Sequence, residues 1–172
     1  MNDLPRLSLI LGGARSGKSR HAEALAARYE RTGVYVATAV AGDDEMAARI
    51  AQHQVQRGGG WRTVEEPLAL APCLQHEAHA DRVVLVDCLT LWLSNIMAAD
   101  RDVDQEIASL VTALKGLAGP VILVSNEVGQ GIVPMNALAR RYRDHAGLLH
   151  QRIAATADHV VFVIAGLAQV LK

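Results

Sequence analysis

The sequence predicts an α/β protein built on a mostly parallel central sheet with helices on both faces. Two observations lead to this fold class. Apolar runs alternate with helical patterns along the chain, and most of these runs are continuously apolar, as is typical of strands buried on both faces. The 172 residues, of which 51% are hydrophobic and 20% charged, suffice for one domain, residues 1–172, with a buried core.

The first third of the chain predicts two strands and two helices. A buried-strand pattern at residues 6–13 ends in glycines, and good helix formers follow at residues 18–30. Residues 33–40 are rich in β-branched side chains and predict the second strand. Residues 43–57 predict a helix, because three acidic residues stand at its start, where the helix dipole favours them.

The remaining elements continue the alternation. Residues 61–66 are a candidate short strand, and Pro67 opens a predicted helix that runs to about His79. The other predicted elements are a strand at 82–89, a helical stretch at 90–99, a helix at 102–119 stopped by Gly119-Pro120, a strand at 120–129, a long helix at 135–157 and a last strand at 159–166.

Composition argues against several classes of protein. The formal net charge is −1, which gives no bulk attraction to nucleic acid or to an anionic membrane. The apolar runs are too short to span a bilayer, and the N-terminus has no signal-peptide layout. Cys73 and Cys88 are too few for a disulfide framework and lack metal-ligand spacing. We therefore expect a soluble, reduced, cytoplasmic protein with no nucleic-acid partner and no integral membrane segment.

A phosphate-binding loop follows the first predicted strand. Gly12, Gly17, Lys18 and Ser19 satisfy the pattern G-x-x-x-x-G-K-[ST], between a strand and a helix as this motif requires. The glycines let backbone N–H groups converge on phosphate oxygens, and the helix N-terminus points at the same place. We expect Lys18 to reach the β- and γ-phosphates and Ser19 to ligate Mg²⁺. The alternative is a chance match in a glycine-containing turn.

Two other strand ends carry polar residues. Asp87 ends an apolar strand in the Walker B arrangement, which predicts a carboxylate on the metal side of the nucleotide. The alternative is that Asp87 only caps the next helix. Asn126 and Glu127 end a second strand in the same way, and they either contact a substrate or satisfy backbone groups of the loop. Asp87 and Glu127 are the candidate general bases for a phosphoryl transfer.

One histidine interrupts an apolar helical face. Met46, Ile50, His53 and Arg57 share a face of the predicted helix at residues 43–57, and Arg49 borders it. The arginines disfavour protonation of His53, which suits a neutral imidazole nucleophile that attacks a phosphate. Spacing alone favours the other interpretation, a partly buried histidine beside a solvated arginine edge.

Five segments together resemble one family. They are GGARSGKSRHAE, DDEMAARIAQHQ, WRTVEEP, DCLTLWLSN and SNEVGQGIVPMNALARRYRD, and they span almost the whole chain. In order and spacing they resemble the bifunctional adenosylcobinamide kinase / adenosylcobinamide-phosphate guanylyltransferases of cobalamin biosynthesis. The first segment is partly generic, whereas the second and the last are much more specific.

The resemblance implies two reactions. A nucleoside triphosphate, ATP or GTP with Mg²⁺, phosphorylates the aminopropanol hydroxyl of adenosylcobinamide. GTP then guanylylates an enzyme histidine, and adenosylcobinamide phosphate takes GMP from it to give adenosylcobinamide-GDP. The guanylylated histidine corresponds to His53. No tightly bound organic cofactor is implied, and the family resembles RecA-type P-loop folds and assembles as a homotrimer.

The resemblance also implies site residues. His53 is the implied catalytic residue, and it joins Lys18 as a catalytic residue and Ser19 and Asp87 as metal ligands, which the phosphate-loop and Walker B patterns predict. The implied nucleotide contacts are Gly12, Gly13, Ala14, Arg15, Ser16, Gly17, Lys18, Ser19, Ala37, Thr38, Ala39, Gln54, Val55, Gln56, Arg57, Glu65 and Asp87. The chain departs from the family at His150, where relatives usually have Asn.

Two other functions compete with this one. A P-loop small-molecule kinase without guanylyltransferase activity would explain Lys18, Ser19 and Asp87 but not the histidine face. A RecA-like ATPase module in a mechanical or regulatory assembly would show ATP hydrolysis stimulated by a polymer. Labelling of the protein by [α-³²P]GTP distinguishes the first alternative from the bifunctional enzyme.

Overall fold

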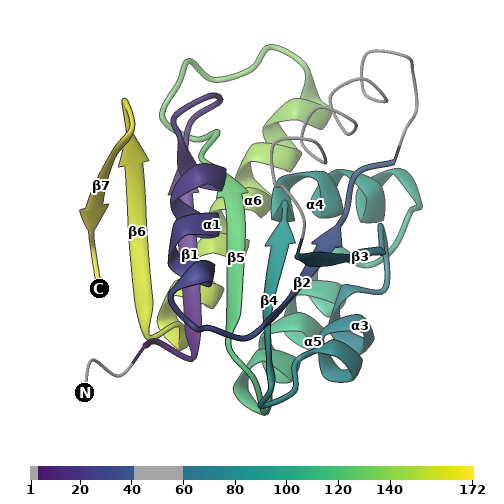
Figure 1. Cartoon of the computed structure of the whole chain (residues 1–172). Helices are drawn as coiled ribbons and strands as arrows, with labels where there is room; N and C mark the ends of the chain where they lie inside the picture. The colour runs from purple at the N-terminus through teal and green to yellow at the C-terminus, as the bar shows by residue number, and fades with distance from the viewer. Residues whose placement is uncertain (1–3, 41–59) are drawn as a thin grey trace.

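The computed structural model describes residues 4–40 and 60–172, and its strands form one seven-stranded sheet (Figure 1). The strands are β1 (Leu7–Gly12), β2 (Thr32–Ala37), β3 (Trp61–Glu65), β4 (Arg82–Asp87), β5 (Val121–Asn126), β6 (His159–Ile164) and β7 (Leu167–Val170). Their order across the sheet is β3-β2-β4-β5-β1-β6-β7, with all neighbours parallel except β6 and β7. The predicted mostly parallel sheet is confirmed, whereas the predicted helix with His53 lies outside the described residues.

Helices cover both faces of the sheet, as the sequence predicts. One face carries α1 (Lys18–Ala27), which packs against β1, β4 and β5. The other face carries α3 (Leu70–Glu77), α4 (Leu89–Ala98), α5 (Val103–Lys115) and α6 (Ala137–Thr156). In the described ranges no helix is both long and apolar enough to cross a membrane.

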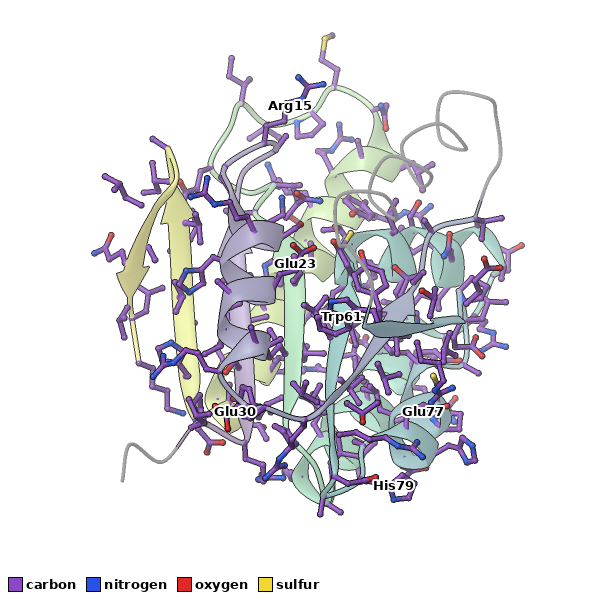
Figure 2. All side chains as sticks on the ribbon, viewed as in Figure 1. Arg15, Glu23, Glu30, Trp61, Glu77 and His79 are labelled. Carbon is purple, nitrogen blue, oxygen red and sulfur yellow. The ribbon has the colours of Figure 1, made fainter. Side chains whose placement is uncertain are left out.

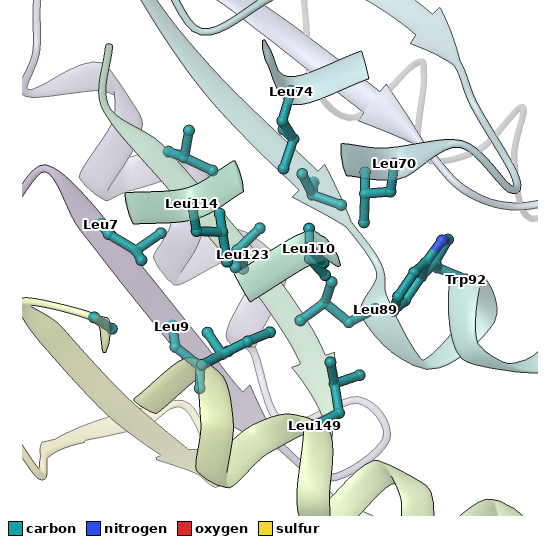
Figure 3. Close-up of a cluster of buried hydrophobic side chains, with 14 of the residues drawn as sticks. Leu7, Leu9, Leu70, Leu74, Leu89, Trp92, Leu110, Leu114, Leu123 and Leu149 are labelled. Atoms are coloured by element: carbon teal, nitrogen blue, oxygen red, sulfur yellow. The ribbon is translucent and has the colours of Figure 1, made fainter. Parts of the chain in front are cut away.

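An apolar cluster fills the space on each side of the sheet. Successive side chains of a strand point to opposite faces, so the adjacent residues Leu9 and Ile10 of β1 belong to different clusters, and both are fully buried. The larger cluster joins the sheet to the α3–α6 layer through a group of leucines and Trp92 (Figure 3). The smaller one includes Leu25 of α1. This burial on both faces holds the strand ends, and therefore the loops that leave them, in place.

Three predicted helix boundaries are wrong by three residues or more. The first helix, expected at residues 18–30, ends at Ala27. The helix expected from Pro67 begins at Leu70, because the Glu66 Oε1 atom accepts the Leu68 and Ala69 N–H groups (2.9 and 2.6 Å) and holds these residues in a turn. The helix expected to run to residue 119 ends at Lys115. Gly116 follows it outside helical geometry, with φ −105° and ψ 4°.

The strand β7 was not predicted. It pairs antiparallel with β6 through a two-residue turn at Ala165 and Gly166, whose φ angles are 52° and 78°. Left-handed φ at both central residues is what a tight hairpin turn requires, and Ala is an uncommon residue for that conformation. The sequence pattern therefore placed the end of the last strand at Gly166, whereas β6 ends at Ile164.

The short strand expected at residues 61–66 is confirmed as β3, at one edge of the sheet. Trp61 packs edge-on against Tyr35, with ring centroids 6.1 Å apart, and lies over Gly33, where a Cβ would meet its ring at 2.8 Å. The next residue, Arg62, pairs with the buried Glu77 of α3. These two contacts add to the parallel pairing of β3 with β2 in holding the edge strand.

Candidate active site

The loop between β1 and α1 lies at the C-terminal edge of the sheet. Arg15 lies at its outer tip (Figure 2), and Gly17, with φ 97°, leads into α1 without a side-chain cap. The first N–H groups of the helix therefore stay available to an anion. Lys18 is only 8% exposed, and its ammonium donates a hydrogen bond to the Gly13 carbonyl at 3.1 Å. The arrangement concentrates positive charge and N–H donors at one point.

The neighbouring strands support this loop. A Cβ at Gly12 would lie 2.5 Å from Ser16 Oγ and 2.6 Å from the Val163 carbonyl oxygen, so only glycine fits there. The Gly166 N–H, from the β6–β7 turn, donates to the Ser16 carbonyl at 2.8 Å. The hairpin that the sequence did not predict therefore braces the loop that it did predict.

Asp87, at the end of β4, faces the start of α1. Its Oδ2 atom accepts hydrogen bonds from the hydroxyls of Ser19 (3.2 Å) and Tyr35 (3.0 Å). Asp87 does not cap the next helix, because α4 has Cys88 at its N-cap and no side-chain cap bond. The site thus places one carboxylate and one hydroxyl side by side next to the phosphate loop, from residues 68 positions apart.

The ends of three neighbouring strands are level with one another. Ala37 is in register with both Asp87 and Glu65, so these expected contact positions lie along one edge of the sheet. Thr38 is buried, and its hydroxyl donates to the Cys88 carbonyl (2.7 Å) and accepts the Cys88 N–H (2.9 Å). The Thr38 side chain therefore ties β2 to β4.

The other expected residues fall into two groups. Ala39 is half-buried and follows Thr38, while Glu65 is exposed at the end of β3. The expected contacts Gln54, Val55, Gln56 and Arg57, and the expected nucleophile His53, lie outside the described residues.

The end of β5 brings two side chains beside the phosphate loop. The Glu127 N–H donates to the Gly12 carbonyl at 3.0 Å, and Asn126 donates to Thr90 Oγ1 at 2.9 Å. Glu127 Oε1 accepts the N–H of Gly129, so the alternative that Glu127 satisfies loop backbone holds for this oxygen. The second oxygen, Oε2, faces His150 Nδ1 at 4.0 Å.

A cavity of about 410 Å³ opens between these elements. Its walls include Ala14 of the phosphate loop, Leu91 of α4, Glu127 and Tyr142 of α6. Burial raises the pKa of Tyr142 to about 12 and also raises the pKa of Cys88, so both stay protonated at neutral pH. The Tyr142 hydroxyl donates to the Thr90 carbonyl at 2.9 Å, which leaves Glu127 as the acidic group of the cavity wall.

Sequence reasoning missed four participants in this site: Tyr35, Thr90, Tyr142 and Ser125. Each contacts a residue 25 to 52 positions away. Tyr142 stands between Arg141 and Arg143 and gives no local signal. For Tyr35, Thr90 and Ser125 the only local signal is a hydroxyl group in or beside an apolar run. Such a residue needs a buried partner, but the sequence does not say which one.

Solved structures support the fold. The flagellar accessory protein FlaH from Methanocaldococcus jannaschii matches with a TM-score of 0.54 at 16% identity, over 98% of this chain and 80% of that one. A second solved structure, described as an ATPase domain, matches with a TM-score of 0.50 at 14% identity, over 91% of this chain and 68% of that one. These likenesses confirm a RecA-like P-loop fold.

Curated relatives match at much higher identity. The bifunctional adenosylcobalamin biosynthesis protein CobP of Pseudomonas aeruginosa is 55% identical over 166 residues, which cover 95% of this chain and 96% of that protein. The CobU protein of the same description from Salmonella typhimurium is 41% identical over 179 residues, covering 95% and 98%. The model of the family described as cobinamide kinase / cobinamide phosphate guanyltransferase matches residues 8–171. The phosphate loop and the Asp87–Ser19 pair lie together at one edge of the sheet. From the family match and these relatives, this chain belongs to the cobinamide kinase / cobinamide phosphate guanyltransferase family.

Proposed function

We propose that one phosphate loop serves both reactions of this family in this chain. In the first, the γ-phosphoryl group of ATP or GTP moves to the aminopropanol hydroxyl of adenosylcobinamide. In the second, GMP moves from GTP to the phosphate formed in the first. The observation that carries the proposal is the convergence of Lys18, Ser19 and Asp87 at one edge of the sheet, within a chain of this family.

Lys18 and the loop N–H groups have the chemistry to hold the triphosphate. A preorganised ammonium and backbone donors stabilise the charge that develops on phosphate oxygens during transfer. The low exposure of Lys18 strengthens that interaction, because less water competes for the ammonium. Positioning and charge neutralisation are nearly all that a direct phosphoryl transfer needs.

The Ser19–Asp87 pair suits Mg²⁺. This ion prefers oxygen ligands and is commonly held by one or two protein oxygens together with phosphates and water. Bound there, Mg²⁺ would neutralise phosphate charge.

His53 is proposed as the covalent guanylyl carrier. A neutral imidazole attacks the α-phosphorus of GTP, a P–N bond forms and pyrophosphate leaves. The phosphate oxygen of the substrate then attacks the same phosphorus, which breaks the P–N bond and restores the imidazole. The resemblance of residues 43–54 to the family supports this role, and the kinase step does not require it.

Two variants test the proposal. Lys18→Ala should lower both activities by about 10²-fold or more, because both reactions need the bound triphosphate. His53→Asn should abolish labelling by [α-³²P]GTP and formation of adenosylcobinamide-GDP. The same variant should keep kinase turnover within about tenfold of the wild type, a barrier change near 1.4 kcal/mol.

The outcomes separate the alternatives. Wild-type protein that phosphorylates adenosylcobinamide but takes no label would be a kinase only. A polymer-stimulated ATPase without either activity would be the RecA-like module. Neither alternative is favoured by the curated relatives, whose names carry the word bifunctional. Guanylyl transfer that persists in His53→Asn would show that another residue is the nucleophile.

Assembly as a homotrimer and a cytoplasmic location belong to the same proposal. The trimer rests on the resemblance to the family, and light scattering on the purified chain tests it. The location is supported by Cys73 and Cys88, both free thiols, as is usual in a reducing compartment. Cell fractionation tests the location.

A further inference from the structure

The wall of the cavity beside the phosphate loop carries a carboxylate, that of Glu127. Glu127 is tied to the loop by its own N–H, which donates to the Gly12 carbonyl. Its side chain, 19% exposed, lines the same cavity as Ala14 of the loop. A hydroxyl group held in this cavity therefore lies between a carboxylate and the place where the loop binds phosphate.

The two oxygens of Glu127 have different surroundings. Oε1 accepts the Gly129 N–H and is thereby fixed. Within the described ranges Oε2 accepts no hydrogen bond, and it lies 4.0 Å from His150 Nδ1. One oxygen is therefore anchored while the other remains open to accept a proton.

His150 is buried behind this carboxylate. The residue is 6% exposed, and its Nε2 atom lies 2.7 Å from Ser125 Oγ. Its Nδ1 atom is buried without a hydrogen-bond partner in the described chain and is turned toward Glu127. When the Ser125 hydroxyl donates to Nε2, the ring carries its hydrogen on Nδ1 and directs it at Glu127 Oε2.

Asp87, the other candidate base, has a different environment. Its Oδ2 atom already accepts hydrogen bonds from two hydroxyls, Ser19 and Tyr35, and it does not line the cavity. Its neighbours suit a role toward the metal side of the nucleotide. Glu127 is the carboxylate that faces the acceptor side.

We propose that Glu127 is the general base of the kinase step and that His150, held by Ser125, is a positioning residue for it. The inference rests on the proposed kinase function. The substrate O–H bond breaks and its proton goes to Glu127 Oε2, while the hydroxyl oxygen bonds to the γ-phosphorus. The bond from the γ-phosphorus to the bridging oxygen breaks, and its electron pair leaves with the nucleoside diphosphate. Glu127 then releases the proton to water.

The cavity has a volume of about 410 Å³, in the range of small-ligand pockets. Leu91 and Val128 give it apolar walls, and Asn126 gives a polar group. These walls suit the aminopropanol arm of the proposed acceptor, with its hydroxyl beside Glu127.

Comparing the two reactions of the family distinguishes a general base at Glu127 from a residue that only holds the loop in shape. A hydroxyl must lose a proton to attack, whereas the acceptor of GMP is a phosphate whose oxygens are already largely ionised at neutral pH. Glu127→Gln keeps an oxygen for the Gly129 N–H but removes the base. We expect kinase kcat to fall about 10²-fold or more, with KM for both substrates within a few-fold of wild type. Guanylyl transfer to supplied adenosylcobinamide phosphate should stay within about twofold, a change far below that expected for lost chemistry.

Three further variants sharpen the test. Glu127→Asp keeps a carboxylate at a shorter reach and should retain part of the kinase kcat. His150→Phe should lower kinase kcat without changing guanylyl transfer, and His150→Asn, which restores an N–H donor, should recover part of the loss. Glu106→Gln, at a half-buried position of α5 where the carboxylate pairs with Arg101 and does not line the cavity, is the control and should change neither reaction.

The outcomes of these experiments either support the assignment of Glu127 as the general base or overturn it. Kinase kcat within about threefold of wild type in Glu127→Gln overturns the inference, because a base contributes far more. Parallel loss of both reactions also overturns it and makes Glu127 a loop scaffold. Wild-type protein without kinase activity but with GTP labelling would refute the proposed kinase function itself, which is a distinct result. If Glu127→Gln fails to fold, Glu127→Asp takes its place in the test. A kinase kcat and KM equal to those of the wild type in Glu127→Asp would then overturn the assignment of Glu127 as the general base.

Discussion

A single oxygen atom, Oδ2 of Asp87, accepts hydrogen bonds from two hydroxyl groups that come from different layers of the fold. Ser19 belongs to α1 and Tyr35 to β2. Two donors on one oxygen restrain the carboxylate from two sides. The local environment of the carboxylate thus follows from residues distant in sequence.

Tyr35→Phe should loosen this carboxylate without removing it. A hydrogen bond to a charged group stabilises by roughly 1.5–3 kcal/mol, so the free energy of unfolding should fall by about that amount or less. The Mg²⁺ concentration that supports half-maximal GTP binding should rise several-fold, measured by titration calorimetry. Tyr29→Phe, which removes a hydroxyl that donates to Pro5, is the matched control and should leave the Mg²⁺ dependence unchanged.

His150 makes stability depend on pH. Burial lowers the pKa of His150 below its ordinary value of 6.5, while Glu127 partly opposes the shift. The unfolded chain therefore binds the proton at higher pH than the folded chain, and stability falls as pH falls through the unfolded pKa. Between about pH 7.5 and about pH 5.5, which brackets the pKa of a free histidine, the Tm of the wild type should drop more than that of His150→Asn. Equal drops in a thermal-denaturation series would contradict the burial of a neutral ring.

At the scale of elements, the segments that connect the strands constrain the choice of residue as strictly as the strands do. The turn after α5 passes directly over the segment that joins α3 to β4. The Gly119 N–H donates to the Ala78 carbonyl at 3.0 Å, and a Cβ at Gly119 would lie 2.0 Å from the His79 carbonyl oxygen. Gly119 was predicted as a helix stop, but its actual role is this close approach of two backbones.

Gly119→Ala should therefore destabilise the protein strongly. The backbone oxygen of His79 cannot move aside as a flexible side chain would, so we expect a loss of roughly 1–3 kcal/mol or more, the scale of overpacking. Urea denaturation measures it. Gly116→Ala is the matched control, since its nearest neighbour, the Ala113 carbonyl oxygen, is 3.9 Å away and its φ is negative. Equal stability of the two variants would refute the backbone contact.

At the scale of the whole molecule, one sheet runs from β3 at one edge to β7 at the other, and the candidate site lies at the C-terminal ends of its central strands. The central strands β4, β5 and β1 carry Asp87, Glu127 and the phosphate loop. In an open α/β sheet this edge is where ligands bind. A ligand there contacts loops from both halves of the chain and so stabilises the sheet as a unit.

GTP with Mg²⁺ should accordingly raise the Tm of the whole chain in a single transition. At a nucleotide concentration of about 100 times Kd the stabilisation is about 2.7 kcal/mol, which corresponds to roughly 5–10 °C for a chain of this size. Differential scanning fluorimetry measures the shift. Lys18→Ala should lose most of it, whereas a second transition that does not respond to nucleotide would contradict a single domain.

Local sequence patterns were sufficient to predict the main elements and the phosphate loop. Strand and helix periods are properties of neighbouring residues, and the loop is contained in residues 12–19, so both could be predicted. The position of Asp87 at a strand end was equally readable, because a strand pattern shows where it stops. His53 and its role stay predictions from the family segments, outside the described residues.

Which strand ends become neighbours depends on tertiary packing. The order β2-β4-β5-β1 results from contacts between side chains distant in sequence, and no local pattern encodes it. That order puts Glu127 beside Gly12, Tyr35 beside Asp87, and Ser125 and Glu127 around His150. It also created the β6–β7 turn that braces the phosphate loop, through an alanine conformation that local preference disfavours. The chemistry of the phosphate loop is contained in neighbouring residues and could be predicted from them. The different roles of Asp87 and Glu127 depend on the groups that each carboxylate faces, which burial and long-range hydrogen bonds determine.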